Sequence, residues 1–472
     1  MEATASVWTP PQYDLSRTPK LVHTAYLSPD AGYPHNFARL VKWCPDGSLA
    51  LAQCENRSLQ FLNLPPELLD STVVHAVVPP PPPVVPRTFI QPSPLLDFAW
   101  YPSASSRDLA SFCFVVSVRE CPVKLLDATD GRLRASYKIV DHRERQIAPH
   151  SLAFNVTADK LYCGFEDAIE VFDVYYPGEG TRLHTTPNKR SRDGLKGIIS
   201  ALAFAADTSS GIYAAGSLSP SAPSSSNIAL FSETTGEVPV MFVGAEKLRN
   251  GAGFGIRAGV SQLMFNPTQP YLLYGSFRRN DVIYNWDLRG DVSNPVQTFG
   301  GHGSPFPNAS NRGKTNQRMR FDVDISGRVL GIGDQDGHVS LFDVTSGDLA
   351  EAAVGGGNAS ASAARETETH AALRFKAHDD AVGSVVFHPL RPYLLSVSGS
   401  RHFDGARDSH SHESDESSSS DSESDGEEEG DGSTEGTPRT GKNAIVKMSR
   451  VRPQPRTFDS SAKLWNLTVE EG

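Results

Sequence analysis

The sequence predicts an all-β fold, a seven-bladed β-propeller, from two patterns that each recur seven times. The first pattern alternates apolar residues and ends in a bulky residue, a small polar residue and a turn. The second pattern is an apolar strand that ends at a turn, and one copy precedes each copy of the first. Repetition of one short β-rich unit along most of a chain is typical of propellers.

The first pattern reads, for example, "HVSLFDVTSG" and "VIYNWDLRG". An aromatic residue followed by Asp at the end of a strand is typical of WD40 repeats, which have a period of roughly 40–45 residues. The small polar residue recurs at gaps of 64, 46, 59, 55, 56 and 123, so the repeats carry insertions. The seven polar residues are Asn63, Asp127, Asp173, Ser232, Asp287, Asp343 and Asn466.

The second pattern places a large side chain just before a turn, and we expect this side chain to pack between neighbouring sheets. The residues are Trp43, Trp100, Phe154, Phe204, Phe265 and Phe387, with Val323 as the exception. Turn residues such as Pro, Asp and Gly then set the hairpins. An all-β sandwich is the alternative fold, but it does not explain seven matched closing strands.

A propeller must close its ring, and residues 19–30, "PKLVHTAYLSPD", are predicted to supply the outer strand of the last blade. Closure removes sheet edges that would otherwise pair with other chains.

The predicted domain organisation follows from the repeats and the composition. Residues 1–18 are expected to be disordered, and residues 19–403 to form the propeller with a proline-rich loop at 77–87. That loop is predicted to be a polyproline II spacer, with an SH3 or WW ligand as the alternative. Residues 353–369 are expected to be a flexible loop. Residues 404–458 are a disordered insertion, acidic and then basic, between two strands of the last blade, and 459–472 hold its closing strand and the C-terminus.

The negative charge of the chain is concentrated in that insertion. The net charge is −11, but residues 401–440 hold thirteen acids against three bases, and the remainder holds 42 acids against 41 bases. Ser418, Ser420, Ser422 and Ser424 each precede an acid by three residues and are candidate phosphorylation sites. The insertion is predicted to compete with an anionic ligand for the face it emerges from, a solvated loop being the alternative. Residues 439–456 are a candidate nuclear import signal.

Cysteine usage and hydropathy indicate an intracellular soluble protein. The five cysteines include no C-x-x-C pair, which favours free thiols in a reducing compartment over disulfides or zinc. We find no signal-peptide core and no apolar stretch of membrane-spanning length.

Basic loops that connect the blades are predicted to converge on one face and bind a phosphate backbone. The alternative is that each cation is simply solvated. No nucleophile–base pair, metal site or cofactor motif is evident, and the glycine-rich "GAGFGIRAG" lacks the context of a phosphate loop. The chain is therefore predicted not to be an enzyme and to take no small-molecule substrate. The candidate RNA-binding residues are Arg143, Arg145, Lys189, Arg190, Arg192, Lys196, Arg257, Arg289, Lys314, Arg318 and Arg320.

Several stretches resemble the telomerase Cajal body protein family, WD40 proteins that bind small Cajal body RNAs and telomerase RNA. These are "NLPPEL", "DATDGRLRASYKIVDH", "PHSLAFNVTADKLYCGFEDAIEVFDVYYPG", "GIISALAF", "NWDLRGD" and "TNQRMRFDVDISG". The resemblance covers roughly residues 36–467 and points to a fungal-type member, although the long disordered N-terminal extension of animal members is lacking here. Arg289 and Arg318 match the family pattern, either as RNA contacts or as a bidentate tie between blades.

The resemblance implies a non-enzymatic scaffold that captures small nuclear or Cajal body RNAs, telomerase RNA among them. Such a scaffold would support ribonucleoprotein assembly, telomere maintenance or localisation to a nuclear body. Its partners would be RNA and the proteins of ribonucleoproteins, and it would not bind a membrane. Its location would be the Cajal body or nucleoplasm, with the cytoplasm as a further compartment. The alternative function is a protein-only WD40 adaptor of the pre-mRNA splicing machinery.

Overall fold

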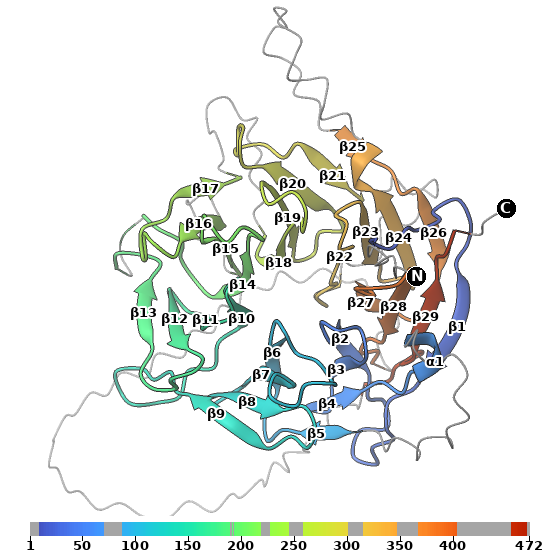
Figure 1. The fold of residues 1–472 in the computed structure, drawn as a ribbon, viewed down its shortest axis with the longest axis horizontal. Helices are drawn as coiled ribbons and strands as arrows, with labels where there is room; N and C mark the ends of the chain where they lie inside the picture. Colours follow the sequence, from blue (N-terminus) through green and yellow to red (C-terminus); the bar gives the residue numbers. More distant parts are fainter. Residues whose placement is uncertain are drawn as a thin grey trace, which may run out of the picture. The chain divides into compact units, whose positions relative to one another are not determined.

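In a computed structural model of the chain, the described residues are 9–69, 87–188, 191, 193–218, 227–244, 258–300, 315–346, 367–403 and 455–469. They are almost entirely β-structure (Figure 1). Within these ranges the helices are α1 (Pro66–Leu69) and one 3₁₀ turn, Val344–Ser346. None of the helices in the described ranges is long and apolar enough to cross a membrane.

The strands form seven separate sheets, the blades. Blade 1 holds β2 (Ala38–Trp43), β3 (Ala50–Cys54), β4 (Ser58–Phe61) and β5 (Thr88–Ile90). Blade 2 holds β6 (Leu95–Trp100), β7 (Cys113–Val118), β8 (Val123–Asp127) and β9 (Leu133–Tyr137). Blade 3 holds β10 (Ser151–Phe154), β11 (Lys160–Phe165), β12 (Ala168–Asp173) and β13 (Thr181–His184). Blade 4 holds β14 (Ile199–Phe204), β15 (Ile212–Ser217), β16 (Ile228–Ser232) and β17 (Met241–Val243).

The last three blades carry the variations on this plan. Blade 5 holds β18 (Val260–Phe265), β19 (Leu272–Phe277), β20 (Ile283–Asp287) and β21 (Gln297–Phe299), with β25 (Thr367–Thr369) paired parallel to β21. Blade 6 holds β22 (Asp322–Val323), β23 (Val329–Gly333), β24 (His338–Asp343) and β26 (Leu373–Lys376). Blade 7 holds β27 (Val382–Phe387), β28 (Tyr393–Ser398), β29 (Ala462–Asn466) and β1 (Lys20–Ala25). The predicted flexible loop thus ends in a strand at 367–369, and its earlier residues lie outside the described ranges.

These seven blades confirm the predicted propeller. Every copy of the second sequence pattern lies on an innermost strand, and every copy of the first lies on or directly after a third strand. The innermost strands surround a common centre (Figure 1). The ring closes as predicted, because β1 pairs with β29 from Lys20–Asn466 to Ala25–Ala462.

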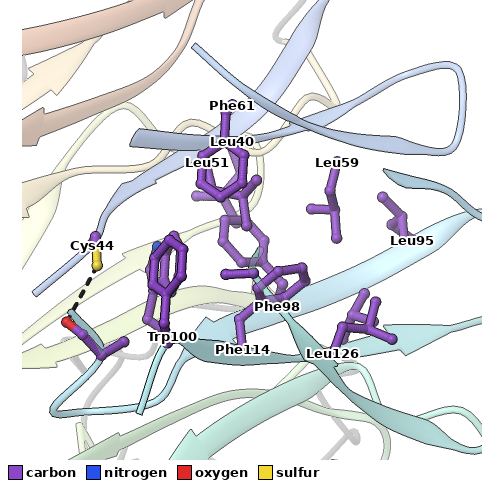
Figure 2. Close-up of a cluster of buried hydrophobic side chains, with 14 of the residues drawn as sticks. Leu40, Cys44, Leu51, Leu59, Phe61, Leu95, Phe98, Trp100, Phe114 and Leu126 are labelled. Carbon is purple, nitrogen blue, oxygen red and sulfur yellow. Dashed lines mark hydrogen bonds between the residues drawn. The ribbon is translucent and has the colours of Figure 1, made fainter. Parts of the chain in front are cut away.

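Seven hydrophobic clusters lie between neighbouring blades, and each contains the large residue that ends one innermost strand. Trp100 belongs to the cluster between blades 1 and 2 (Figure 2), together with Phe61 and Phe114. The indole ring centroid lies 6.1 Å from that of Phe61 and 5.6 Å from that of Phe114. Val323 fills the same position between blades 5 and 6. The predicted packing between sheets is therefore confirmed, and each buried side chain of this size contributes roughly 1.5–3 kcal/mol.

Hydrogen bonds also link each innermost strand to the next one around the ring. In each link a side chain of one blade meets a backbone group of its neighbour. The seven links are Lys42 Nζ to Phe98 O, Leu152 N to Asp97 Oδ2, Ser151 Oγ to Ile199 O, Ser200 Oγ to Val260 O, Gln262 Nε2 to Phe321 O, Phe387 N to Asp322 Oδ2, and Val41 N to Ser384 Oγ. Three of these side chains, Lys42, Asp97 and Asp322, are ionisable. The hydrogen bonds that connect the blades therefore also position charged groups at the centre of the ring.

In blade 7, β28 and β29 pair antiparallel although 63 positions separate Ser398 from Ser461. Asp380 fixes both ends of this connection, since its carboxylate accepts hydrogen bonds from Ser400 Oγ (2.6 Å) and Phe458 N (2.9 Å). Residues 401–456 form a separate unit, in which the backbones of His402 and Arg456 bond to each other. The acidic run, its four candidate serines and nearly all of the candidate import signal lie outside the described residues.

Candidate nucleic-acid interface

The two faces of the propeller are set by the meander of each blade. Connections between blades, and turns that join second to third strands, lie on one face, which we call the connection face. Turns that join first to second strands and third to fourth strands lie on the opposite face. A charge therefore belongs to one face or the other according to the loop that carries it.

Segment 315–320 runs along the inner edge of the connection face from blade 5 to blade 7. Arg279 Nε, in blade 5, donates to Asn316 Oδ1 at 2.6 Å. Gln317 Nε2 donates to Gly399 O of blade 7 at 2.8 Å, and Arg320 N donates to Gly383 O at 2.9 Å. The segment is thus anchored on both sides of blade 6 and passes directly into β22.

Arg318 and Arg320 come from this segment and are directed toward the centre of the ring. Arg320 and Asp322 both line the central channel. Arg318 precedes Arg320 by two residues, and the charges of Arg320 and Asp97 both act on it, so it lies close to the channel. The side chain of Arg318 is half-buried.

Two further arginines reach the same place from equivalent positions in blades 2 and 5. Arg119 and Arg278 each follow the last residue of a second strand. Their backbone N–H groups donate to the residue before the innermost strand of the same blade, Pro94 O at 3.0 Å and Gly259 O at 2.8 Å. We call Arg119, Arg278 and Arg318 the rim arginines. Within the described part of the chain, none of the three guanidinium groups has a hydrogen-bond or ion-pair partner.

The electrostatics of the rim favour an anion. Burial, together with the positive charge of Arg320, lowers the pKa of Arg318 to about 10, and Arg278 and Arg39 act in the same direction. Burial and then the charges of Arg318 and Arg119 lower the pKa of His150. Because like charges from several blades raise one another's energy here, a bound anion would stabilise the arrangement.

Below the rim, the central channel is a cavity of about 290 Å³ lined by the innermost strands of all seven blades. Lys42 Nζ lies 3.6 Å from Asp97 Oδ1, and Arg320 Nη1 donates to Ser261 O at 3.0 Å. Burial raises the pKa of Asp322 to about 7. Burial also lowers the pKa of Lys42, which Asp97 opposes, so the excess of positive charge in the channel comes from the Arg320 guanidinium.

The predicted RNA-binding residues are distributed unevenly. Arg318 and Arg320 lie at the channel, whereas Arg143 and Arg145 are exposed farther out, on the connection between β9 and β10. Lys196 is half-buried on the connection between β13 and β14. The remaining connection-face candidates, Lys189, Arg190, Arg192, Arg257 and Lys314, lie outside the described residues.

Arg289 does not belong with this group. It follows β20 in a turn between third and fourth strands, and so lies on the opposite face. Its guanidinium bonds to both carboxylate oxygens of Asp287, at 3.0 and 2.7 Å, and lies 3.5 Å from the ring centroid of Tyr271. The expected bidentate tie between blades is therefore wrong, because the partner two residues earlier belongs to the same turn of blade 5.

The sequence patterns did not identify four cations near the channel as candidate binding residues: Arg39, Lys42, Arg119 and Arg278. Lys42 is on an innermost strand, and Arg39 pairs with Glu55 at the edge of blade 1. A superposition of the repeats carries one usable signal, since it aligns Arg119 with Arg278 at the end of a second strand.

A Ser–His–Asp arrangement is present in blade 7 but is sealed. His378 Nδ1 lies 3.1 Å from Asp459 Oδ2, and its Nε2 lies 2.8 Å from Ser396 Oγ, which also accepts from Trp465 Nε1 at 2.9 Å. The side chain of His378 is 0% exposed, so a substrate has no access. This network joins β28 to β29 and has a structural role. Among the described residues, no group of His, Cys, Asp and Glu could hold a metal ion.

No protein-family profile matches the chain. The sequence is 29% identical to telomerase Cajal body protein 1 of Bos taurus over 413 aligned residues. The aligned region covers 87% of this chain and 66% of the bovine protein. The predicted resemblance to the telomerase Cajal body proteins is confirmed. The Drosophila melanogaster homologue of telomerase Cajal body protein 1 is 22% identical over 76% of this chain and 56% of its own length. The chain spans just under two thirds of the length of the mammalian telomerase Cajal body proteins that it matches.

A further relative carries a different name. "Guanine nucleotide-binding protein negative regulator 1" of Schizosaccharomyces pombe is 27% identical over 312 residues, 65% of this chain and 70% of that protein.

Proposed function

We propose that this chain is a non-enzymatic WD40 scaffold that binds RNA on its connection face. The observation that carries the proposal is the convergence of Arg119, Arg278 and Arg318 at the channel mouth without partners in the described ranges. Unpaired guanidinium groups form strong bidentate bonds to phosphate oxygens. A phosphate backbone therefore matches this surface better than an apolar partner does.

Exposed aromatic side chains on the same face add a means of holding bases. Tyr26 and Tyr33, on the connection from blade 7 to blade 1, are 73% and 41% exposed, and Phe458 is 70% exposed. Stacking of an unpaired base on an aromatic ring contributes roughly 1–3 kcal/mol. Arginines and aromatics together suit single-stranded segments of a folded RNA.

The names of the mammalian relatives refer to telomerase and to the Cajal body, and they support the following choice of RNA and compartment. We infer small nuclear or Cajal body RNAs as ligands, telomerase RNA among them, and a place in the Cajal body or nucleoplasm. In this function the propeller would support assembly or localisation of a ribonucleoprotein.

Charge reversal at the rim tests the proposal. Arg119→Glu combined with Arg278→Glu should weaken binding of a small nuclear RNA at least about tenfold, since each hydrogen bond to a charged group is worth roughly 1.5–3 kcal/mol. The slope of log K against log salt should fall by roughly 0.7–0.9 for each phosphate that the variant no longer binds. Arg289→Glu, on the opposite face, is the matched control. Equal binding by all three proteins would contradict an RNA site at the rim.

A protein-only adaptor is the second candidate function, and exposed aromatics on the opposite face favour it. Tyr175 and Tyr176, in the turn after β12, are 64% and 81% exposed. Crosslinking followed by sequencing of bound RNA separates the two functions. Partners that are all recovered after RNase treatment, with no crosslinked RNA, would support the adaptor and reject the RNA scaffold.

A further inference from the structure

We propose that the central channel binds a single phosphate group through Arg318, Arg320 and Lys42. The site is distinct from the exposed basic loops that the sequence indicated, because it lies inside the ring. Only the identification of the phosphate as part of an RNA chain rests on the proposed function.

The positions of the three cations carry the inference. Arg318, Arg320 and Asp322 stand at alternate positions where the chain enters β22, and Arg320 and Asp322 line the channel. Lys42 enters from blade 1, where its ammonium donates to Phe98 O and lies 4.9 Å from the Phe98 ring centroid. Lys42 and Arg320 both line the 290 Å³ cavity, and Arg318 is near enough to Arg320 for that positive charge to act on it.

The carboxylates of the channel balance only one of these cations, since Asp97 Oδ1 lies 3.6 Å from Lys42 Nζ. Asp97 accepts hydrogen bonds from Phe98 N at 2.9 Å and Leu152 N at 3.0 Å, one at each oxygen. Asp322 accepts from Phe387 N at 2.8 Å. Over the described ranges, no carboxylate lies within ion-pair distance of Arg318 or Arg320. The Arg318 and Arg320 side chains are half-buried and have no counter-charge at that distance in the described ranges, so an anion beside them would stabilise the protein.

The donors that remain available fit a phosphate group. Arg320 uses Nη1 for Ser261 O, and its other N–H groups have no acceptor among the described residues. The hydroxyls of Ser151 and Ser200 already donate to backbone carbonyls of the next blade, whereas Ser384 Oγ accepts from Val41 N and keeps its own O–H available. Recognition therefore falls mainly to the two guanidinium groups, with the Lys42 ammonium and the Ser384 hydroxyl as further donors, and together these match several oxygens around one phosphorus. The cavity is at the lower end of the range for ligand pockets, roughly 300–1,000 Å³, which suits one phosphate group rather than a folded RNA segment.

Titration calorimetry with pyrophosphate, in chloride buffer at constant ionic strength, tests the site directly on the full chain. We expect one saturable site, weakened about tenfold or more in Arg318→Gln, whose side chain is only half-buried. Arg289→Gln, on the opposite face, should bind as the wild type does. Arg320→Gln should also lose binding if circular dichroism shows that it folds. No saturable binding, or equal loss in Arg318→Gln and Arg289→Gln, would overturn the proposal.

RNA oligonucleotides with and without a 5′-phosphate then identify the source of the phosphate group. Tighter binding of the phosphorylated form, abolished by Arg318→Gln, would assign the site to a chain end. If pyrophosphate displaces the oligonucleotides equally well with and without the 5′-phosphate, the site binds an internal phosphodiester. Pyrophosphate binding without competition would assign it to a free anion. RNA binding that depends on Arg119 and Arg278, with no pyrophosphate binding, would reject this site and leave the proposed function intact.

Discussion

Removal of the Asp459 carboxylate should detach the third strand of blade 7 from the second. In Asp459→Ala, four donors lose their acceptor: His378 Nδ1 (3.1 Å), Asp379 N (3.2 Å), Ser461 N (2.9 Å) and Ser461 Oγ (2.6 Å). Burial by itself raises the pKa of Asp459, but the bonds from His378 and Ser461 outweigh it and hold that pKa well below its usual range. The carboxylate is therefore strongly stabilised by the native structure.

The magnitude follows from the burial of His378. A hydrogen bond to a charged acceptor contributes roughly 1.5–3 kcal/mol, and a buried donor without a partner costs roughly 1–3 kcal/mol. Because the His378 side chain is 0% exposed, water cannot replace the missing acceptor, and the remaining oxygen near Nδ1, Ser461 Oγ, lies at the longer distance of 3.3 Å. We expect a destabilisation of about 4 kcal/mol, localised in blade 7.

Hydrogen exchange of the β28 and β29 amides measures this local effect, alongside thermal unfolding of the whole chain. Asp173→Ala is the matched control, since Asp173 is an exposed residue at the end of β12 whose carboxylate accepts only from Tyr175 N and Tyr176 N within the described ranges. It should cost under about 1 kcal/mol. Equal protection of β28 and β29 in the two variants would refute a stabilising role for the His378–Asp459 pair.

Three further predictions concern pH, ring closure and the acidic insertion. Burial lowers the pKa of His388 to about 4, so the folded protein favours the neutral imidazole. The contribution of His388 to the free energy of unfolding is therefore complete above about pH 6.5 and is lost as the pH falls toward 4. The loss amounts to about 3 kcal/mol, and His388→Gln should remove it from the pH profile of thermal unfolding. Deletion of residues 1–25 exposes the edge of β29, and sedimentation should then show self-association; a stable monomer would contradict closure as the protection against edge pairing. Deletion of residues 404–440 should tighten RNA binding at low salt, and unchanged affinity there would leave the insertion a solvated loop.

The repeats explain why so much of the fold could be predicted. Each blade is a local unit whose apolar alternation and turn residues lie within a short stretch of chain. The position of Trp100 before its turn therefore already implied a place between two sheets. The strand at residues 20–25 was predictable because the ring needs one more outer strand. The candidate site was only partly predictable: Arg318 was named, but Arg119 and Arg278 were not.

The sequence by itself determined the seven-bladed ring, its closure, and the two strands of blade 7 that flank the long acidic connection, because each depends on short-range patterns and their repetition. Only the tertiary structure decided which charges meet. Arg289 shares a W-D motif with the repeats, yet its turn lies on the opposite face and its partner is Asp287. Arg119, Arg278 and Arg318 are far apart in the chain, and they converge because blades 2 and 5 place Arg119 and Arg278 at equivalent positions while the segment before β22 brings Arg318 to the same channel. Long side chains from separate repeats come together only when the ring has closed, so short sequence patterns cannot predict these contacts.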